Sequence, residues 1–455
     1  MTEPRFSSEA DAVTYIFRSL RRLRDVPRGP DEQTRDTTPT LKLINEAQLL
    51  STVREYAVVT GSKGKGSTTF MTAKILQHLG HTVGMISSPH LVTYRERIRV
   101  NGRAIPEADL IRILSELAPA IDTIEDGLSE SQYFSPQGIF LAIALRWFDE
   151  QGVNAAVLEV GRGGRYDDIA VVPNRLSLFT PILLEHPRQL GPTIERVAWH
   201  KAGIIKPHSF AYSVPQPTTV LDILQAEADA RDAEFYWIMP SDMGQFAGTT
   251  PTGIRMRLGR YGDIDLPMLG RYQIDNATLA VQGAGNMHGR LPGISHGSPE
   301  YVAAVKAGLA ASVWPGRVQQ LQSNPDVYVD GAIHADSARS FVRSLEGRIS
   351  EPIIAIVGVP DDKDYAGVFG ALGPISQTLI VTETARNISL HFLPPEEALA
   401  AARRHSTDVR FAPGLNAALD TALPLAGTDG TVLIAGTLSL VADAIGLYGL
   451  SYEEI

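Results

Sequence analysis

The chain has 455 residues, a formal net charge of −10 and no cysteine. Its length predicts two or three domains, because a domain usually has roughly 100–200 residues. The lack of cysteine excludes disulfides, thiolate metal sites and cysteine nucleophiles. The acidic balance excludes a general basic field for nucleic acid. The N-terminus is unlike a signal peptide and no apolar run reaches the roughly 20 residues that cross a bilayer, so we expect a cytoplasmic protein without membrane or nucleic-acid partners.

The first half of the chain predicts alternating helices and strands. An amphipathic helix is expected over 9–24 and a Pro-rich polar loop over 27–40. Apolar strands then follow at 55–61, 81–88, 154–161 and 175–184, and helices are expected from Ser67 to about Leu79, over 106–121 and over 135–152. This alternation is typical of a mostly parallel sheet covered by helices.

The predicted secondary structure changes twice in the second half of the chain. Between about 211 and 269, short alternating runs between Gly, Pro and Asp predict a small antiparallel annex. After "VWPGRV" (313–318), strands and helices alternate again and predict a second α/β domain. We therefore divide the chain into a helical and loop segment (1–50), a central domain with the annex (51–312) and a C-terminal domain (313–455). The last residues, "SYEEI", predict a frayed end.

The stretch "VTGSKGKGSTTF" (59–70) is the clearest candidate for a binding loop. It lies between a predicted strand and a predicted helix, an arrangement that presents backbone N–H groups and a helix N-terminus to an anion. Lys65 supplies a cation for β- and γ-phosphates, and Ser67 can cap the helix or face a magnesium ion. The glycines, serine and lysines that we assign to phosphate binding are Gly61, Ser62, Lys63, Gly64, Lys65, Gly66 and Ser67.

This loop departs from the common phosphate-loop pattern of Gly, four residues and Gly-Lys-Ser/Thr. Val59 stands at the position of the first glycine, and Gly66 separates Lys65 from Ser67. A structural turn is the alternative, which the strand before the loop and the helix after it disfavour.

Several further motifs stand in a fixed order along the chain. They are "SSPHLVTYRERIRVNGRAI" (87–105), "LEVGRGGRYD" (158–167), "LLEHPRQLGPTIERVAWHKAGIIKP" (183–207), "LGRYQIDNATLAV", "WPGRV", "DGA", "DDKDYAGV" and "AGTLSLVAD". With the loop "GSKGKGS", this series resembles the folylpolyglutamate synthase/dihydrofolate synthase family, a branch of the Mur ligases. The resemblance runs from about Tyr56 to Ala444, nearly the whole chain.

The resemblance implies a fold and a reaction. The fold is α/β, with an N-terminal Mur-ligase-type ATPase domain built on a parallel sheet and a smaller C-terminal α/β ligase domain. The reaction is an ATP-dependent, ADP-forming ligation in which a substrate carboxylate is phosphorylated and the amine of an amino acid then displaces phosphate. Cations must be preorganised around the transferring phosphoryl group in such a reaction. The implied partners are a small carboxylate and an amino acid, and a monomer is the family-like state.

The resemblance also assigns roles to individual residues. Lys65, Lys201 and His186 are the implied catalytic residues, and Lys201 matches a lysine that is carbamylated in the family. Asn276, Arg317 and Asp330 match positions that contact the adenine, the phosphates and the ribose of ATP. Magnesium is implied at Ser67, Ser88, Glu159 and His186. His334 and Ser337 lie in the segment expected to meet the incoming amino acid.

The chain departs from the family mainly on the substrate side. Lys63 replaces the loop asparagine, and Glu185 replaces the aspartate before His186. Other departures are Gln137 and Gly138 for Phe and Glu, Asp168-Ile169-Ala170 for Ala/Ser-Thr-Asn, and Ile333, His334 and Ala335 for His, Asn and Pro. A site built for one polar substrate rejects another when buried polar groups lose their partners. We therefore predict the ligase chemistry more firmly than the identity of the substrate.

Three readings remain open on sequence alone. The first is an active ligase, acting either on dihydropteroate or folate with glutamate, or on another carboxylate and amine in a specialised pathway. The second is a non-catalytic nucleotide-binding relative, which the altered segments "DIA" and "AIHADS" favour. The third is a hydrolase or kinase that uses the same loop, which the second α/β domain disfavours.

Overall fold

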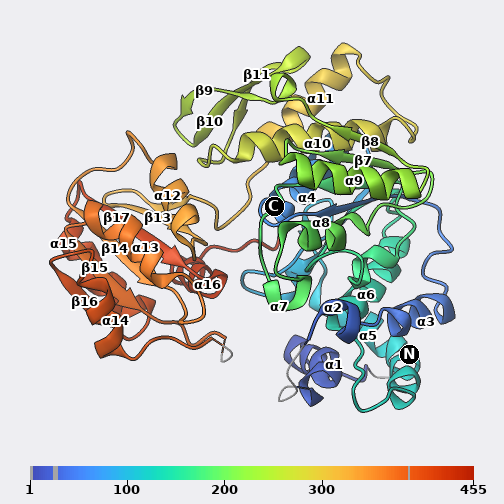
Figure 1. Ribbon diagram of the computed structural model, residues 1–455, viewed down its shortest axis with the longest axis horizontal. Coiled ribbons are helices and arrows are strands. Elements are labelled where there is room, and N and C mark those ends of the chain that lie inside the picture. Colours follow the sequence, from blue (N-terminus) through green and yellow to red (C-terminus); the bar gives the residue numbers. More distant parts are fainter. Residues whose placement is uncertain (1–3, 24–28, 388–389) are drawn as a thin grey trace.

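The computed structural model describes residues 4–23, 29–387 and 390–455. Figure 1 shows two α/β bodies, with the C-terminal one (orange to red) beside the larger N-terminal one (blue to yellow). The two-domain α/β fold predicted from the sequence is confirmed. In the described part of the chain, no helix is both long and apolar enough to cross a bilayer.

The larger body contains an eight-stranded sheet with the order β4-β3-β2-β5-β1-β6-β7-β8. Its strands are β1 (Glu55–Thr60), β2 (Val83–Ile86), β3 (Ile98–Val100), β4 (Arg103–Ala104), β5 (Ala155–Glu159), β6 (Leu176–Phe179), β7 (Phe210–Ser213) and β8 (Glu234–Trp237). All neighbours are parallel except β2–β3 and β3–β4. The four strands predicted from apolar runs in the first half are therefore present.

Helices cover both faces of this sheet. They are α4 (Lys65–His78), α5 (Glu107–Asp126), α6 (Pro136–Glu150), α7 (Pro187–Leu190), α8 (Ile194–Ala202), α9 (Thr218–Ala230), α10 (Gln273–His288) and α11 (Pro299–Ala310). Alternate residues of β1 point to opposite faces: Val58 packs in the cluster formed with α5 and α6, whereas Val59 packs in the cluster formed with α4 and α10. The continuous apolar run of β1 therefore reflects burial on both faces.

The N-terminal segment is more helical than expected. Helix α1 (Glu9–Arg22) matches the predicted amphipathic helix as far as residue 22; Leu23 is its C-cap, and residue 24 lies outside the described residues. The predicted loop is wrong over half of its length, because 31–34 form α2 (Asp31–Thr34) and 38–40 open α3 (Thr38–Glu46). Its residues 27 and 28 lie outside the described residues. Pro39 stands at the start of α3, where the missing proline N–H costs nothing. The segment packs on α5 and α6 within one continuous core.

The antiparallel annex is smaller than the 211–269 range predicted. It consists of β9 (Gln245–Thr250), β10 (Gly253–Leu258) and β11 (Gly262–Leu266) in the order β11-β10-β9. The apolar run "FYWIM" belongs instead to β8, which pairs in parallel with β7 at the edge of the large sheet. The prediction failed because β8 is mostly exposed. The sequence pattern of an exposed edge strand resembles that of a strand in a small antiparallel sheet.

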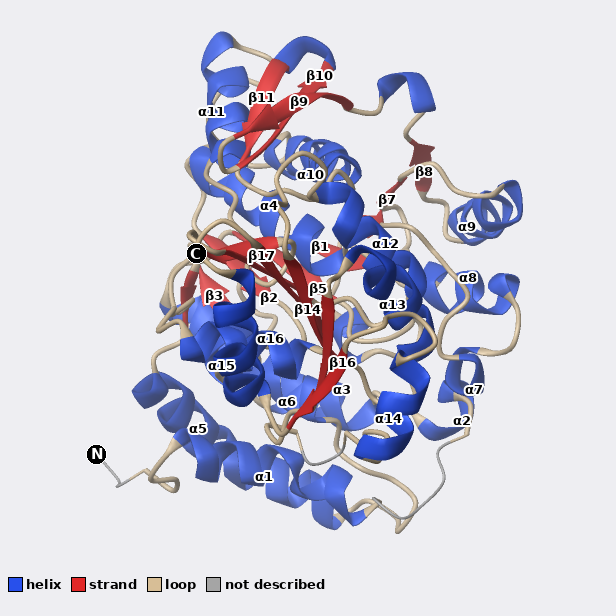
Figure 2. Ribbon diagram, turned by 90° about the vertical axis from the view of Figure 1, so that its left-hand side faces the viewer, coloured by secondary structure: helices blue, strands red, loops and turns tan. Residues whose placement is uncertain are grey.

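The C-terminal body contains a six-stranded sheet with the order β12-β13-β17-β14-β15-β16. Its strands are β12 (Gln319–Gln322), β13 (Asp326–Asp330), β14 (Ile353–Gly358), β15 (Thr378–Thr382), β16 (Val409–Ala412) and β17 (Thr431–Gly436), and only β12 is antiparallel. One face packs with α12 (Ala335–Ser344), α13 (Tyr365–Leu372) and α14 (Pro395–Ala402), and the other packs with α15 (Leu415–Ala426) and α16 (Leu438–Leu447). Figure 2 shows this sheet between its helices.

The segment "SYEEI" is not frayed, contrary to the prediction. It crosses back to the larger body, where Glu454 forms an antiparallel bridge with Arg103 of β4. The Arg99 guanidinium donates to the carbonyl of Tyr452 (2.6 Å). The edge of the sheet at β4 supplies backbone partners for this segment. The composition of the last five residues alone does not predict that contact.

Candidate active site

The phosphate loop follows β1 directly and is shaped by two close approaches. Gly61 and Gly64 have positive φ angles (144° and 86°). A Cβ at Gly61 would lie 1.9 Å from Oγ1 of Thr180, and one at Gly64 would lie 2.2 Å from Oδ1 of Asn276. Only glycine fits both positions. Gly64 is also the N-cap of α4, so the helix begins at Lys65, two residues earlier than predicted.

Two lysines meet at the carbonyl of Gly61. Lys65 Nζ donates to this oxygen at 3.0 Å and Lys201 Nζ at 2.8 Å. Lys201 also pairs with Glu185 Oε1 at 2.8 Å. Its ammonium is almost fully buried, and burial lowers the pKa of Lys201 to about 8 although Glu185 opposes the shift. The structure therefore brings the predicted residues Lys65 and Lys201 together at the start of the loop.

Glu185, which replaces the family's aspartate, forms an ion pair with Lys201 and lies near enough to Lys65 to feel its charge. Burial raises the pKa of its carboxyl, but Lys201 and Lys65 outweigh burial and the net pKa is lowered. The carboxylate is therefore ionised at neutral pH and compensates the charge of Lys201. The neighbouring His186 has its pKa lowered, chiefly by burial, and its charged neighbours include Glu185, Arg162 and the two lysines.

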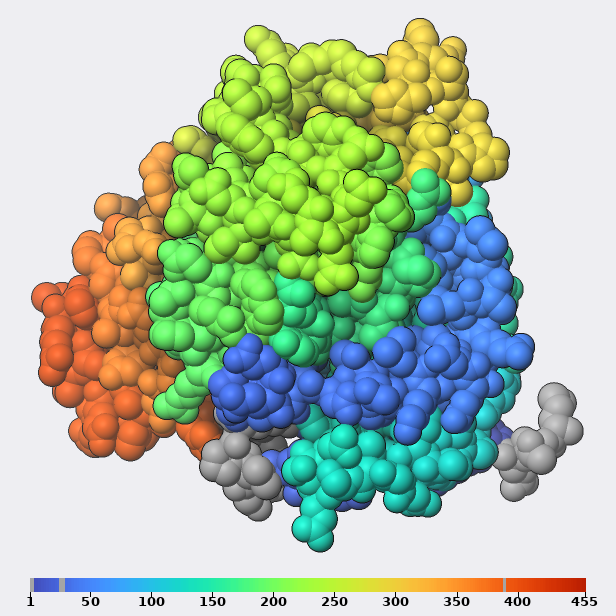
Figure 3. Space-filling model, turned by 45° about the vertical axis from the view of Figure 1, so that its right-hand side comes forward, coloured from blue at the N-terminus to red at the C-terminus, as the bar shows by residue number. Residues whose placement is uncertain are grey.

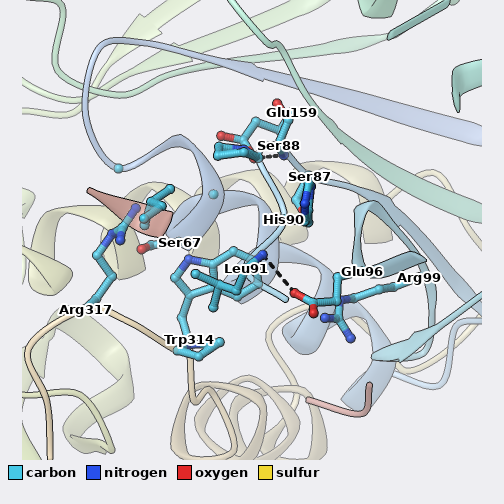
Figure 4. A pocket seen from close by; sticks show the side chains of 15 residues that line it. Ser67, Ser87, Ser88, His90, Leu91, Glu96, Arg99, Glu159, Trp314 and Arg317 are labelled. Carbon is cyan, nitrogen blue, oxygen red and sulfur yellow. Dashed lines mark hydrogen bonds between the residues drawn. The ribbon is translucent and has the colours of Figure 1, made fainter. Parts of the chain in front are cut away.

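A cavity of about 80 Å³ opens beside the loop, where the two bodies meet (Figure 4). Ser67 from α4, Ser88 after β2 and Glu159 at the end of β5 line it from the N-terminal body. Trp314 and Arg317 line it from the segment that joins the bodies. The parallel register places Glu159 opposite Val59, just before the loop, because the carboxyl ends of β1 and β5 share one edge.

Glu159 is buried at the inner end of this cavity. One of its oxygens accepts the backbone N–H of Ser88 (2.9 Å). Burial raises the pKa of its carboxyl to about 7, an effect that Lys65 and the Ser88 bond reduce. A buried carboxylate with an elevated pKa gains stability from a cation brought close to it.

The donor set at this cavity suits magnesium. Mg²⁺ prefers hard oxygen ligands, usually one or two carboxylates with water and substrate phosphates. Glu159 and the hydroxyls of Ser67 and Ser88 supply such oxygens in one lining. His186 lies outside this lining, near Lys201, so the four predicted magnesium positions do not share one cavity. Across residues 4–23, 29–387 and 390–455, no cluster of three or more His, Asp or Glu side chains forms a protein-only metal site.

Arg317 and Asp330 extend the site toward the C-terminal body. Asp330 ends β13 and accepts the backbone N–H of Val318 (2.9 Å). Burial raises the pKa of its carboxyl to about 6, and Arg317 and Lys63 oppose that shift. Lys63, the substituted loop residue, therefore lies close enough to the C-terminal body to influence its charges.

Asn276 lies behind the loop, on the first turn of α10. Its side chain abuts Gly64, and its amide donates to Gln273 Oε1 (2.8 Å). The hydroxyl of Thr68 donates to Asn276 Oδ1 (3.4 Å). Asn276 thus supports the loop and the start of α4 from the side, and it lies outside the cavity of Figure 4.

The substituted segment around His334 forms the start of α12. The Ser337 hydroxyl accepts the His334 N–H (3.1 Å) and donates to the His334 carbonyl (2.8 Å). Ala335, which stands at the family's proline position, donates its N–H to Asp364 (2.9 Å), a bond that proline cannot make. Burial lowers the pKa of His334, and Lys63 lowers it further. The segment is therefore an ordered helix cap that faces the phosphate loop.

Two other departures from the family, Asp168 and Gly138, both lie against Thr40. Asp168 is buried, accepts the Thr40 hydroxyl (2.6 Å) and lies 3.7 Å from the Arg35 guanidinium. A Cβ at Gly138 would lie 1.9 Å from Thr40 Oγ1, so glycine leaves the room that Thr40 needs. Arg35 also donates to Asp167 (3.1 Å), which holds the glycine loop after β5. The N-terminal segment thus supplies polar partners for Asp167 and Asp168 through Arg35 and Thr40.

Sequence reasoning missed two residues of the site. Trp314 stacks on Phe70 (5.1 Å between ring centroids) and covers Gly66. Glu96 accepts the backbone N–H groups of Leu91, Val92 and Thr93 (3.0, 3.0 and 2.9 Å) and so fixes the loop after Ser88. Trp314 lies in the motif "VWPGRV" and Glu96 in "YRERI". Neither the domain boundary at the first motif nor the spacing of the second predicts these contacts.

The comparisons with known proteins agree with this geometry. Residues 316–438 match the family model described as "Mur ligase, glutamate ligase domain". The chain is 31% identical over 320 residues to folylpolyglutamate synthase of Lacticaseibacillus casei, covering 69% of this chain and 73% of that one. It is 30% identical over 395 residues to dihydrofolate synthase/folylpolyglutamate synthase of Mycobacterium tuberculosis, covering 81% and 78%. A solved M. tuberculosis folylpolyglutamate synthase with ADP and AMPPCP superimposes with a TM-score of 0.82 at 27% identity, covering 96% and 99%.

The fold and the site define a ligase of the Mur type, in which a phosphate loop and a second α/β domain meet at one cavity. Within that class, the chain belongs to the folylpolyglutamate synthase/dihydrofolate synthase family. It is an ATP-dependent, ADP-forming acid–amino acid ligase by this membership.

Proposed function

We propose that this ligase joins the carboxylate of a pteroate- or folate-type substrate to the amine of glutamate through an acyl phosphate. One observation carries the proposal. Ser67, Ser88, Glu159 and Arg317 line one cavity from four segments at the junction of the two bodies, and the Lys65 ammonium lies on the Gly61 carbonyl of the same loop. The names of the relatives supply the substrate class.

The loop from Gly61 to Ser67 would hold the phosphates of ATP. Its backbone N–H groups and the start of α4 favour an anion. Lys65 now donates to the Gly61 carbonyl and would exchange this contact for a phosphate oxygen. Arg317 would reach the phosphates from the linker, Asp330 the ribose and Asn276 the adenine side. Magnesium, held by Glu159, Ser67 and Ser88, with His186 nearby, would neutralise charge on the transferring phosphoryl group.

The reaction balances in two steps. A carboxylate oxygen of the substrate forms a bond to the γ-phosphorus, and the bond between that phosphorus and the bridging oxygen breaks to release ADP. The amine of glutamate then attacks the acyl carbon, phosphate leaves and the amine loses a proton. Lys65 and Arg317 stabilise the charge of the first step. Approach of the two bodies excludes water from the acyl phosphate, which water would otherwise hydrolyse.

Lys201 is the candidate for carbamylation. A carbamate forms on the neutral amine, and the lowered pKa of about 8 leaves a substantial neutral fraction at slightly alkaline pH. The modification would turn a buried cation into an anion beside Glu185 and would require their present ion pair to open. Intact-protein mass spectrometry under bicarbonate, with Lys201→Arg as the control, tests it.

A second candidate function is ligation of another carboxylate and amine. The segment around His334 favours it, because Ala335 and Ser337 commit their hydrogen bonds to the cap of α12. A purely nucleotide-binding role is the third candidate, and the charges kept at Lys65, Glu159 and Lys201 disfavour it.

A panel assay separates these candidates. Phosphate release from ATP and magnesium is measured with dihydropteroate, reduced folates and unrelated carboxylates, each with a panel of amino acids. Mass spectrometry checks every positive for an amide. Release that requires a pteroate or folate with glutamate supports the first function, and release with another pair supports the second. ATP binding without release for any pair contradicts both.

A further inference from the structure

A second, larger cavity lies on the larger body away from the phosphate loop. Its volume is about 670 Å³, within the range of roughly 300–1,000 Å³ that small-molecule sites occupy. Its walls come from β7, the loop before β9, the end of β10, α10, and the segment leading into α11. Figure 1 shows the annex strands beside α10 and α11 at the top of the molecule, and Figure 3 shows this yellow-green and yellow region on the surface.

This cavity is distinct from the nucleotide site. Helix α10 carries Asn276 near its start, behind the phosphate loop, and Gly285 in the wall of the cavity. Nine residues of helix separate the two by about 14 Å along the axis. A helical glycine also opens this wall, because a Cβ at Gly285 would lie 2.9 Å from the Tyr301 hydroxyl.

Aromatic rings form much of the wall. Tyr212, Tyr261, Tyr301 and His296 all line it. The His296 and Tyr301 rings lie 4.6 Å apart. The Tyr301 side chain is fully buried, and its hydroxyl lies beside Arg260 and Tyr261. Such a wall suits a planar ring.

One cation in the wall lacks a carboxylate partner. Arg260 donates to the Tyr261 hydroxyl (3.2 Å), and its guanidinium lies 5.2 and 5.6 Å from the Tyr261 and Tyr301 rings. Among the residues that the structure describes, no Asp or Glu forms an ion pair with it. Arg257, also in the wall, is by contrast paired with Asp263 (2.7 Å).

The one carboxylate in the lining is Asp242. It lies on an exposed turn, where it accepts the Ser241 hydroxyl (3.4 Å). No ion pair joins it to Arg260 within the described ranges. The Arg260 guanidinium is thus the unpaired positive charge of the wall. Its planar fork of N–H donors matches a carboxylate.

We propose that this cavity is a binding site for a planar aromatic carboxylate, with the ring against the tyrosines and the carboxylate on Arg260. The site is separate from the ligase reaction and does not depend on its substrates.

Calorimetric titration of the full chain with 2-naphthoate tests the site, and the isosteric 2-naphthamide tests the need for charge. We expect saturable binding of the acid, and binding of the amide weaker by about tenfold, since a charge-assisted contact contributes about 1.4 kcal/mol or more. Arg260→Gln should weaken binding of the acid by about tenfold and leave binding of the amide unchanged. Arg257→Gln, whose charge is already paired, should change the affinity for the acid by less than about threefold.

Two further arms locate the site. Gln282→Trp places a large side chain in the wall from the exposed face of α10 and should abolish binding without touching Arg260. Saturating AMPPCP should leave the affinity for 2-naphthoate unchanged. The proposal is overturned if the acid does not bind saturably, if both arginine variants weaken it equally, or if AMPPCP competes with it.

Discussion

The ammonium of Lys201 lies 2.8 Å from Glu185 Oε1 and 2.8 Å from the carbonyl of Gly61. This geometry ties the residue that replaces the family's aspartate to the first glycine of the phosphate loop. Glu185 keeps the negative charge of the aspartate on a side chain one methylene longer and pairs with Lys201. The substitution therefore keeps a carboxylate at the centre of the site.

The variant Glu185→Gln should impair the enzyme and Glu185→Asp should not. Glutamine leaves a buried ammonium without its counter-charge, and removing one partner of a buried pair costs about 3–5 kcal/mol, less here because Glu185 is partly exposed. We expect a loss of turnover of at least about tenfold and a lower midpoint of urea unfolding. If Gln and Asp behave alike in turnover and unfolding, the ion pair is not what the site requires.

Lys65→Ala should abolish ATP turnover while the fold persists. Lys65 is the first residue of α4, and its ammonium donates to the Gly61 carbonyl of its own loop, so its removal leaves the core intact. Phosphate release and circular dichroism measure the two effects. Lys74→Ala on the same helix, where the ammonium donates to Ile455, is the matched control and should keep turnover. Normal turnover by Lys65→Ala would refute the phosphate-loop assignment.

Asp330→Asn should weaken nucleotide binding by about tenfold, because a carboxylate on a ribose hydroxyl forms a charge-assisted hydrogen bond. The amide oxygen can still accept the Val318 N–H, so the strand should stay in place. In the wild type, protonation below the pKa of about 6 should weaken binding as the pH falls, and the variant should lose this dependence. Nucleotide titrations at several pH values measure both effects. An affinity unchanged by the variant would contradict the ribose role.

Thr40→Val should destabilise the protein by about 1–3 kcal/mol, because the buried Asp168 loses a hydrogen-bond donor. The change conserves shape, so urea unfolding reports the hydrogen bond. Thr123→Val, at an exposed position on α5, should be nearly neutral. Gly138→Glu, which restores the family's residue, should destabilise more than either, since its Cβ would overlap Thr40. An unchanged free energy of unfolding for Gly138→Glu would contradict the close packing of Thr40 against residue 138.

A buried histidine pair should make stability depend on pH. His288 Nε2 donates to the Ile294 carbonyl (2.6 Å), and its Nδ1 lies 2.7 Å from His81 Nε2, so one N–H is shared between the two rings. Burial lowers the pKa of His81 to about 4 from 6.5. The unfolded chain therefore binds more protons between these values, and the free energy of unfolding should fall by about 3 kcal/mol as the pH drops through that window. His81→Gln should flatten this dependence, and an unchanged slope would contradict the assignment.

The sequence predicts those parts of the fold whose signals are local. The strand before Gly61, the alternation of α and β, and the order of motifs all follow from short-range patterns. The contact of Thr40 with Asp168, the covering of Gly66 by Trp314 and the return of Tyr452 to Arg99 do not. Each joins residues far apart in the chain, so no periodicity or spacing encodes it. The cavity beside Arg260 was missed for the same reason, because five separate segments build it.

The most direct test of the central claim follows the oxygen atoms of the carboxylate. The purified protein is given ATP, magnesium, glutamate and dihydropteroate or a reduced folate in which both oxygens of the acceptor carboxylate are the heavy isotope. Amide product and phosphate are analysed by mass spectrometry. An acyl phosphate predicts one heavy oxygen in the released phosphate for each amide formed. Amide formation with unlabelled phosphate would contradict the acyl phosphate, and phosphate release without amide would contradict ligation of these substrates.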